Sequence, residues 1–150
     1  MATTQAPEQS QMDSTPQFKP QEISFPLPKA LHTTAHVHLT FLETCTMVFL
    51  STTTPGNSAG SVASMGSFVY AMPDRTNPRA AISTTIYTAA SVEYATRIAK
   101  ILARRMGVPV YVGCSIDATA LELTVEEEME GLVKIVETIM GRWQDRQVAK

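Results

Sequence analysis

The sequence is poor in cysteine, in glycosylation signals and in long apolar runs. Cys45 and Cys114 are its only cysteines, so it has no Cys-x-x-Cys motif and no framework of several disulfides. Asn57 and Asn77 are not followed by the Ser or Thr pattern of a glycosylation acceptor. No stretch approaches the ~20 apolar residues that span a bilayer, and the first residues lack the apolar core of a secretory signal. We therefore expect an intracellular domain with reduced thiols.

Charge is also scarce. Only 17% of the 150 residues are charged, and 12 Lys and Arg against 14 Asp and Glu give a formal net charge of −2. This balance predicts no general attraction to nucleic acid or to anionic membranes. The charges are unevenly spread, because residues 44–73, 80–92 and 106–116 contain none. The charged segments have helical patterns and the uncharged ones have strand patterns.

The N-terminal residues differ in composition from the rest. Residues 1–29 hold five of the nine prolines and no glycine. Such a segment buries too little apolar surface to offset its chain entropy. We predict a flexible tail over 1–29, a single α+β domain over 30–146 and a C-terminal tail over 147–150. In an alternative reading, the apolar side chains of Phe18, Ile23, Phe25 and Leu27 dock as a short extended segment on the domain or on a partner.

Alternation of apolar and polar residues predicts the strands. Ala35, Val37 and Leu39 alternate with His36 and His38, which is the period of a half-buried strand. A second β-rich run follows after two residues and predicts a hairpin. The full set of predicted strands is 35–42, 45–52, 62–72, 81–87, 108–116 and a shorter one at 119–123.

Two helices are predicted from their caps and apolar stripes. Ser91 precedes the first helix, and Gly107 and Pro109 end it. Thr124 and Glu127 form the capping box of the second helix. The predicted stripes are Val92, Ala95, Ala99, Leu102 and Met106 in the first helix, and Val125, Met129, Leu132, Val136, Ile139 and Trp143 in the second.

These elements predict an α+β fold, in which two helices pack on one face of a six-stranded antiparallel sheet in the order ββββαββα. Two helices cover only one face, and the second face of an antiparallel sheet normally carries charged residues. Here that face is predicted to be uncharged, which is typical of the centre of a protein interface. The residues predicted to contact a partner are His36, His38, Thr40, Val48, Leu50, Thr85 and Tyr87.

No combination of residues predicts catalysis. His36 and His38 share one strand face, and Cys45 could supply a third ligand across the hairpin, but two histidines alone do not make a zinc site. A small metal-dependent or ligand-binding enzyme that uses these three residues is the alternative of another class. Neither cysteine has a basic neighbour that would lower its pKa, so core thiols are favoured over nucleophiles. We expect no catalytic, cofactor-binding or metal-binding residue.

Residues from about Leu31 to Trp143 resemble the proteasome assembly chaperone 4 family, including its fungal members. The likeness rests on three segments: the hairpin 31–51, the helix-to-strand passage 99–112 (AKILARRMGVPVYV) and the acidic helix start 121–131 (LELTVEEEMEG). The long Pro- and Gln-rich N-terminal segment and the extension around Trp143 depart from the family pattern.

The resemblance implies a small antiparallel sheet with two helices, no enzyme activity and no cofactor. It implies a heterodimer with proteasome assembly chaperone 3, formed sheet against sheet, that promotes 20S α-ring formation by binding the α5 subunit of the proteasome. It also implies a cytoplasmic protein, with the nucleus as a further compartment. A same-class alternative is that the chain is the chaperone 3 member of the pair.

Overall fold

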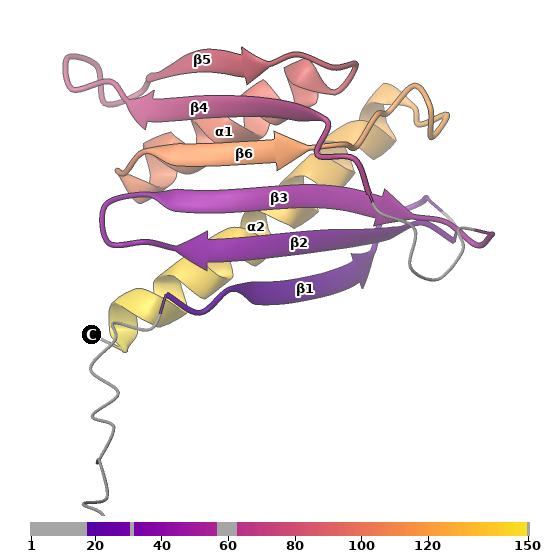
Figure 1. Ribbon diagram of the computed structural model, residues 1–150, viewed down its shortest axis with the longest axis horizontal. Coiled ribbons are helices and arrows are strands. Elements are labelled where there is room, and N and C mark those ends of the chain that lie inside the picture. Colours follow the sequence, from indigo (N-terminus) through magenta and orange to yellow (C-terminus); the bar gives the residue numbers. More distant parts are fainter. Residues whose placement is uncertain (1–17, 31, 57–62, 150) are drawn as a thin grey trace, which may run out of the picture.

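The computed structural model describes residues 18–30, 32–56 and 63–149 of the chain. These residues form six strands and two helices, with the strands in one layer and the helices in a second (Figure 1). In chain order the elements are β1 (Gln21–Pro26), β2 (Thr34–Phe41), β3 (Thr46–Thr53), β4 (Ser67–Pro73), β5 (Ala81–Tyr87), α1 (Val92–Met106), β6 (Val110–Cys114) and α2 (Val125–Val148). The predicted α+β class, with six strands and two helices, is confirmed.

The six strands form one sheet in the order β1-β2-β3-β6-β4-β5. All neighbours are antiparallel except β3 and β6, which run parallel. The sheet is therefore mixed, whereas a purely antiparallel sheet was predicted. The physical reason is the crossover through α1, which is long enough to return the chain into the middle of the sheet between β3 and β4.

The sixth strand comes from a different segment than predicted. Residues 21–26, assigned to the flexible tail, form β1 and pair with β2, with Ile23 opposite Val37 and Phe25 opposite Ala35. These two apolar side chains pack against the core, as in the docking alternative. The predictions for residues 1–17 lie outside the described part of the chain.

The predicted strand at 119–123 is wrong, because this segment folds into turns. The Asp117 carboxylate accepts the backbone N–H of Thr119, and the N–H of Leu121 donates to the carbonyl of Asp117. Glu122 has a positive φ of 54°. Local hydrogen bonds from an Asp side chain compete with strand pairing and favour a turn.

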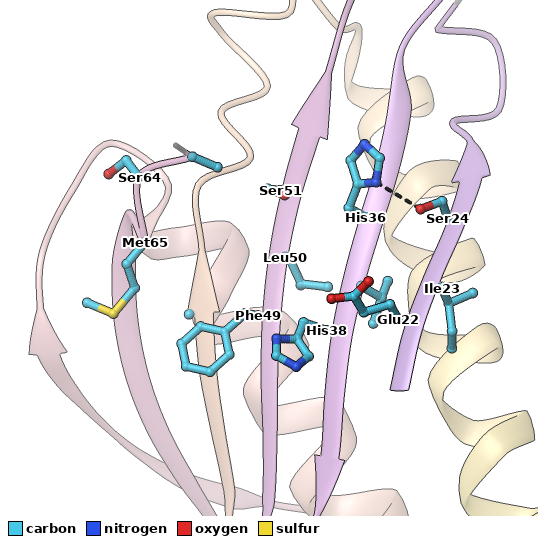
Figure 2. A pocket seen from close by; sticks show the side chains of 13 residues that line it. Glu22, Ile23, Ser24, His36, His38, Phe49, Leu50, Ser51, Ser64 and Met65 are labelled. Carbon is cyan, nitrogen blue, oxygen red and sulfur yellow. Dashed lines mark hydrogen bonds between the residues drawn. The ribbon is translucent and has the colours of Figure 1, made fainter. Parts of the chain in front are cut away.

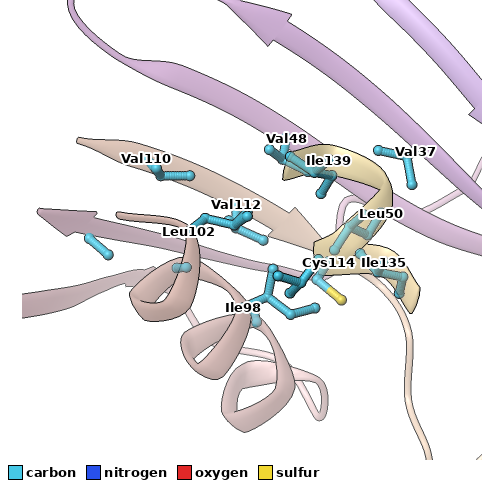
Figure 3. Close-up of a cluster of buried hydrophobic side chains, with 14 of the residues drawn as sticks. Val37, Val48, Leu50, Ile98, Leu102, Val110, Val112, Cys114, Ile135 and Ile139 are labelled. Atoms are coloured by element: carbon cyan, nitrogen blue, oxygen red, sulfur yellow. The ribbon is translucent and has the colours of Figure 1, made fainter. Parts of the chain in front are cut away.

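Both helices lie on the same face of the sheet, as predicted (Figure 1). Helix α1 packs on β4, β5 and β6, and α2 places Trp143 against Phe41 of β2, with 5.5 Å between the ring centroids. Between them lies a core in which the largest side chains are fully buried (Figure 3). Its labelled members are Val37, Val48, Leu50, Ile98, Leu102, Val110, Val112, Cys114, Ile135 and Ile139.

The helix caps explain where the helices begin and end. Thr124 and Glu127 exchange the two hydrogen bonds of a capping box, as predicted. Gly107 ends α1 in a left-handed conformation, with φ of 70°. Ser91 precedes α1 as predicted, but its side chain makes no cap hydrogen bond; its hydroxyl donates instead to the carbonyl of Cys114.

The apolar stripe of α2 is shifted from the prediction. Val125 and Met129 are 76% and 43% exposed, and the first buried residue of the helix is Gly131. The buried side chains are Leu132, Ile135, Val136, Ile139 and Met140. The early turns of this long helix thus lie outside the core. In the described part of the chain, neither helix is long and apolar enough to cross a membrane.

Candidate partner interface on the open face of the sheet

The face of the sheet turned away from both helices is called the open face here. Strand register decides which side chains lie on it, because paired residues share a face. Its members are Glu22, Ser24, Pro26, Thr34, His36, His38, Thr40, Met47, Phe49, Ser51, Thr53, Phe68, Tyr70, Met72, Ile82, Thr84, Tyr87, Tyr111 and Gly113. Glu22, on edge strand β1, is the only charged residue in this set.

Aromatic side chains form a continuous row across the middle of the open face. The rings of Phe49 and Phe68 are nearly parallel, with 1° between their planes and 6.2 Å between their centroids. Phe68 continues to Tyr111 at 5.9 Å, and Tyr111 continues to Tyr70 at 4.8 Å. Such separations are typical of favourable aromatic pairs. The row places a broad apolar surface at the centre of a face that neither of the two helices in the described residues covers.

Gly113 makes this row possible. It lies on β6 between Phe49 of β3 and Phe68 of β4, and it is the direct partner of both. A Cβ atom at this position would lie 2.6 Å from Cδ1 of Phe49. Because glycine has no such atom, the two phenylalanine rings can lean over β6 and meet above it.

A polar end of the open face surrounds His36. Nδ1 of His36 is 2.8 Å from the Ser24 hydroxyl, and Nε2 is 2.7 Å from the Thr53 hydroxyl. Beside it, a hollow of about 470 Å³ runs over β1, β2 and β3 to residues 63–65 (Figure 2). Figure 2 shows His38 and Phe49 side by side in it, and their ring centroids are 6.2 Å apart. Hydroxyls can donate or accept, so both ring nitrogens of His36 have a hydrogen-bond partner.

The alternative of a metal site at His36, His38 and Cys45 finds no support in the geometry. His36 lies five residues before the end of β2, where it pairs with Ser51 of β3. Cys45 lies in the turn between β2 and β3. At ~3.3 Å per residue, roughly 16 Å of strand separates His36 from that turn. The described residues contain no group of three or more His, Cys, Asp or Glu side chains that could hold a metal ion.

The two cysteines differ in environment. Cys114 is fully buried, and burial raises the pKa of its thiol to about 12. A thiol with so high a pKa is protonated at neutral pH and is a poor nucleophile. The prediction of a core thiol is therefore confirmed for Cys114. Cys45 is partly exposed in the hairpin turn.

Three of the seven residues predicted to face a partner lie elsewhere. Val48 and Leu50 are 0% and 2% exposed and belong to the core under the helices. The error has a plain cause: the hairpin register pairs His38 with Phe49, so the odd-numbered residues of β3 share the face of the histidines. Thr85 pairs with core residue Val69, so it also lies on the helix side, although it is exposed.

The other four predicted residues, His36, His38, Thr40 and Tyr87, lie on the open face. Their contact with a partner stays a prediction. The list of seven predicted contacts lacks the aromatic row itself: Phe49, Phe68, Tyr70 and Tyr111. Alternation in the sequence could have indicated them. Phe49 lies two residues after Met47, and Phe68 lies two residues before Tyr70. Tyr111 lies opposite Tyr70 on the neighbouring strand.

Comparison with known proteins adds two findings. The family model described as proteasome assembly chaperone 4 matches residues 34–116, which run from the start of β2 to just after β6. A solved structure described as a crystal structure of a novel chaperone complex for yeast 20S proteasome assembly is similar in fold, with a TM-score of 0.55 and 16% sequence identity. The similarity covers 84% of this chain and 96% of that one. No curated protein matches the sequence.

Proposed function

The chain belongs to the proteasome assembly chaperone 4 family, and from this we propose that it pairs with proteasome assembly chaperone 3 through the open face. The pair then promotes formation of the 20S α-ring by binding the α5 subunit of the proteasome. A proteasome assembly chaperone acts by binding, so its function needs no catalytic group. We place this activity in the cytoplasm, with the nucleus as a further compartment.

The observation that carries the pairing proposal is the composition of the open face. Antiparallel sheets whose second face meets water normally carry polar and charged side chains there. This face instead has a row of four aromatic rings, flanked by Met47 and Met72 and by uncharged polar residues. Aromatic and methionine side chains are enriched at interface centres, where charged ones are depleted.

The geometry also suits a sheet as the partner. Two sheets pack face to face when side chains of both inner faces interdigitate in a layer about 10 Å thick. The aromatic row supplies such side chains across β3, β6 and β4, the middle of the sheet. A stable pairing of this kind buries on the order of 1,600 Å² or more. The polar end around His36 and Glu22 lies toward the β1 edge and would form the rim.

The test is a binding measurement between this chain and chaperone 3, with one substitution in the aromatic row. Phe68→Asp puts a charge at the centre of the row, where Phe68 contacts Phe49 and Tyr111. We expect a loss of affinity of a hundredfold or more by calorimetry, since a buried unpaired charge costs several kcal/mol. Met129→Asp, on an exposed part of α2, is the matched control and should bind as the unchanged chain does.

Two readouts separate the steps of the proposal. Normal binding of chaperone 3 by Phe68→Asp, in a chain with an unchanged far-UV circular dichroism spectrum, would contradict pairing through the open face. Capture of the proteasome α5 subunit by the assembled pair, and not by an unrelated α-ring subunit, tests the second step. Failure of that capture with intact pairing would refute the choice of ring subunit alone.

A further inference from the structure

The two edge strands of the sheet differ in how well they are protected. Exposed edges present unpaired backbone groups to which another strand can add, and proteins usually protect them with charges, prolines or bulges. Edge strand β1 carries Glu22 and ends at Pro26. Edge strand β5 has the sequence AISTTIY, without a charge or a proline. Within the described residues, β4 is the only strand that pairs with β5.

Edge strand β5 is also apolar and exposed. Ile82, Ile86 and Tyr87 are 49%, 55% and 60% exposed, and Thr84 and Thr85 between them are exposed as well. The only irregularity in its pairing with β4 lies near its end, where the register shifts opposite Phe68 and Val69. Figure 1 shows β5 as the outermost strand, with its free side away from β4. Residues of this type favour extended backbone, so the strand is a ready template for addition.

Positive charge gathers at one end of this edge. Arg79 lies two residues before β5 and is exposed. Nη1 of Arg104 on α1 donates a hydrogen bond to the backbone carbonyl of Arg79, at 3.4 Å. Arg75 lies in the same loop and is exposed. None of the ion pairs among the described residues uses these three guanidinium groups. The acid of this loop, Asp74, is occupied by hydrogen bonds from the N–H and hydroxyl of Thr76.

The opposite end of the edge has no such charge. Residues 88–91, which follow β5, are Thr, Ala, Ala and Ser. Near the positive end lies a hollow of about 480 Å³, lined by apolar residues that include Met72, Ile82 and Pro109 and by the charged residues Asp74 and Arg75. A strand added to β5 would therefore meet a cluster of arginines at the N-terminal end of β5 and an uncharged edge beyond them.

We propose that β5 binds an extended segment of another protein by strand addition, and that this segment carries acidic residues at its C-terminal end. In antiparallel addition, the C-terminal end of the added strand lies beside the N-terminal end of β5, where Arg75, Arg79 and Arg104 gather. Backbone hydrogen bonds supply affinity, and the arginines supply direction. The free backbone groups of β5 lie at the edge of the sheet, beside the open face and not on it, although the side chains of Ile82 and Tyr87 belong to the open face.

The experiment uses the full chain and a synthetic ten-residue peptide of alternating Val and Thr that ends in three Asp residues. Fluorescence anisotropy measures its affinity, and hydrogen exchange locates it. We expect saturable binding, with slowed amide exchange in 81–87 and unchanged exchange in 21–26. Arg79→Glu should weaken binding roughly fivefold, since it replaces a favourable charge by a repulsive one. Arg142→Glu, a charge reversal on the distant end of α2, is the matched control.

Three comparisons make the result decisive. A peptide with alternate backbone amides N-methylated should not bind, because it lacks the donors of a strand ladder, and equal binding would overturn strand addition. A peptide with its Asp residues at the N-terminal end should bind several-fold more weakly, and equal or tighter binding would overturn the antiparallel assignment. No binding of the original peptide at millimolar concentration would overturn the proposal.

Two other occupants of the edge are distinguished in the same experiment. Slow exchange of 81–87 that appears only at high protein concentration, together with a dimer in sedimentation, would assign the edge to a second copy. Slow exchange of 81–87 in the dilute chain without peptide would show that the chain itself covers the edge. Either result would overturn binding of an acidic segment.

Discussion

Neighbouring residues Phe49 and Leu50 provide a sharp test of the strand register, because they point to opposite faces of β3. Leu50 is 2% exposed and belongs to the core cluster, where Figure 3 shows it beside Ile135 of α2. Leu50→Ala leaves a cavity there, and such changes cost about 3 kcal/mol of unfolding free energy. Phe49 is only partly buried and stacks on Phe68. Phe49→Ala should cost about 1 kcal/mol, the scale of one aromatic pair.

The effects on partner binding should be reversed. Phe49→Ala removes a central aromatic anchor, so we expect roughly thirtyfold weaker binding to chaperone 3, corresponding to about 2 kcal/mol. Leu50→Ala should change that affinity less than threefold. Domains of this size are stable by 5–15 kcal/mol as a rough guide, so the variant stays folded.

Urea unfolding and calorimetry measure the two quantities separately. With a slope of about 2 kcal/mol per molar urea, Leu50→Ala should lower the unfolding midpoint by about 1.5 M and Phe49→Ala by about 0.5 M. A Leu50→Ala chain that unfolds at the normal urea concentration but fails to bind chaperone 3 would refute the register argument, because it would place Leu50 on the partner side.

Three further predictions concern Cys114 and the hydroxyl that binds its carbonyl. Ser91→Ala removes the hydroxyl that donates to the carbonyl of Cys114 and leaves that carbonyl without this partner. We expect the unfolding free energy, measured in urea, to fall by about 1–3 kcal/mol. A fall below the error of the measurement would contradict this role. In a thiol titration at pH 8 the folded chain should react at Cys45 and not at Cys114, with both reacting in urea; fast labelling of both in the folded chain would count against the raised pKa of Cys114. Because burial raises this pKa from 9.0 to about 12, the folded chain holds the thiol proton more tightly than the unfolded chain. This contribution to stability should be complete below pH 9 and should be lost as the pH rises toward 12.

Sequence patterns predicted the local elements well and the long-range arrangement less well. The helix spanning Val92–Met106 was marked at its C-terminal end by Gly107, and the capping box at Thr124 marked the start of the next. Caps and stripes are local signals, and they depend on residues a few positions apart. The hairpin of β2 and β3 was likewise local, and it is present.

What the sequence could not supply depends on contacts between distant residues. Strand β1 lies in a proline-rich stretch whose composition indicated a tail, and it is ordered because Ile23 and Phe25 find an edge and a core to pack against. The parallel placement of β6 beside β3 cannot be read from periodicity, since a buried strand has the same pattern in either direction. Val48 and Leu50 were predicted to face a partner because the register of β3 was taken one residue out of step, and such a shift exchanges the two faces of a strand.

The position of β6 between β3 and β4 has a consequence for how the chain acquires its structure. Strands β1–β3 and strands β4–β5 are separate hydrogen-bonded groups until residues 110–114 join them. A growing polypeptide that has not yet left the ribosome through that point carries two unlinked hairpin units, and neither brings Phe49 near Phe68. The aromatic row is therefore complete only once residues 110–114 are in place, so pairing through the open face, as proposed above, requires nearly the whole sheet to be assembled first.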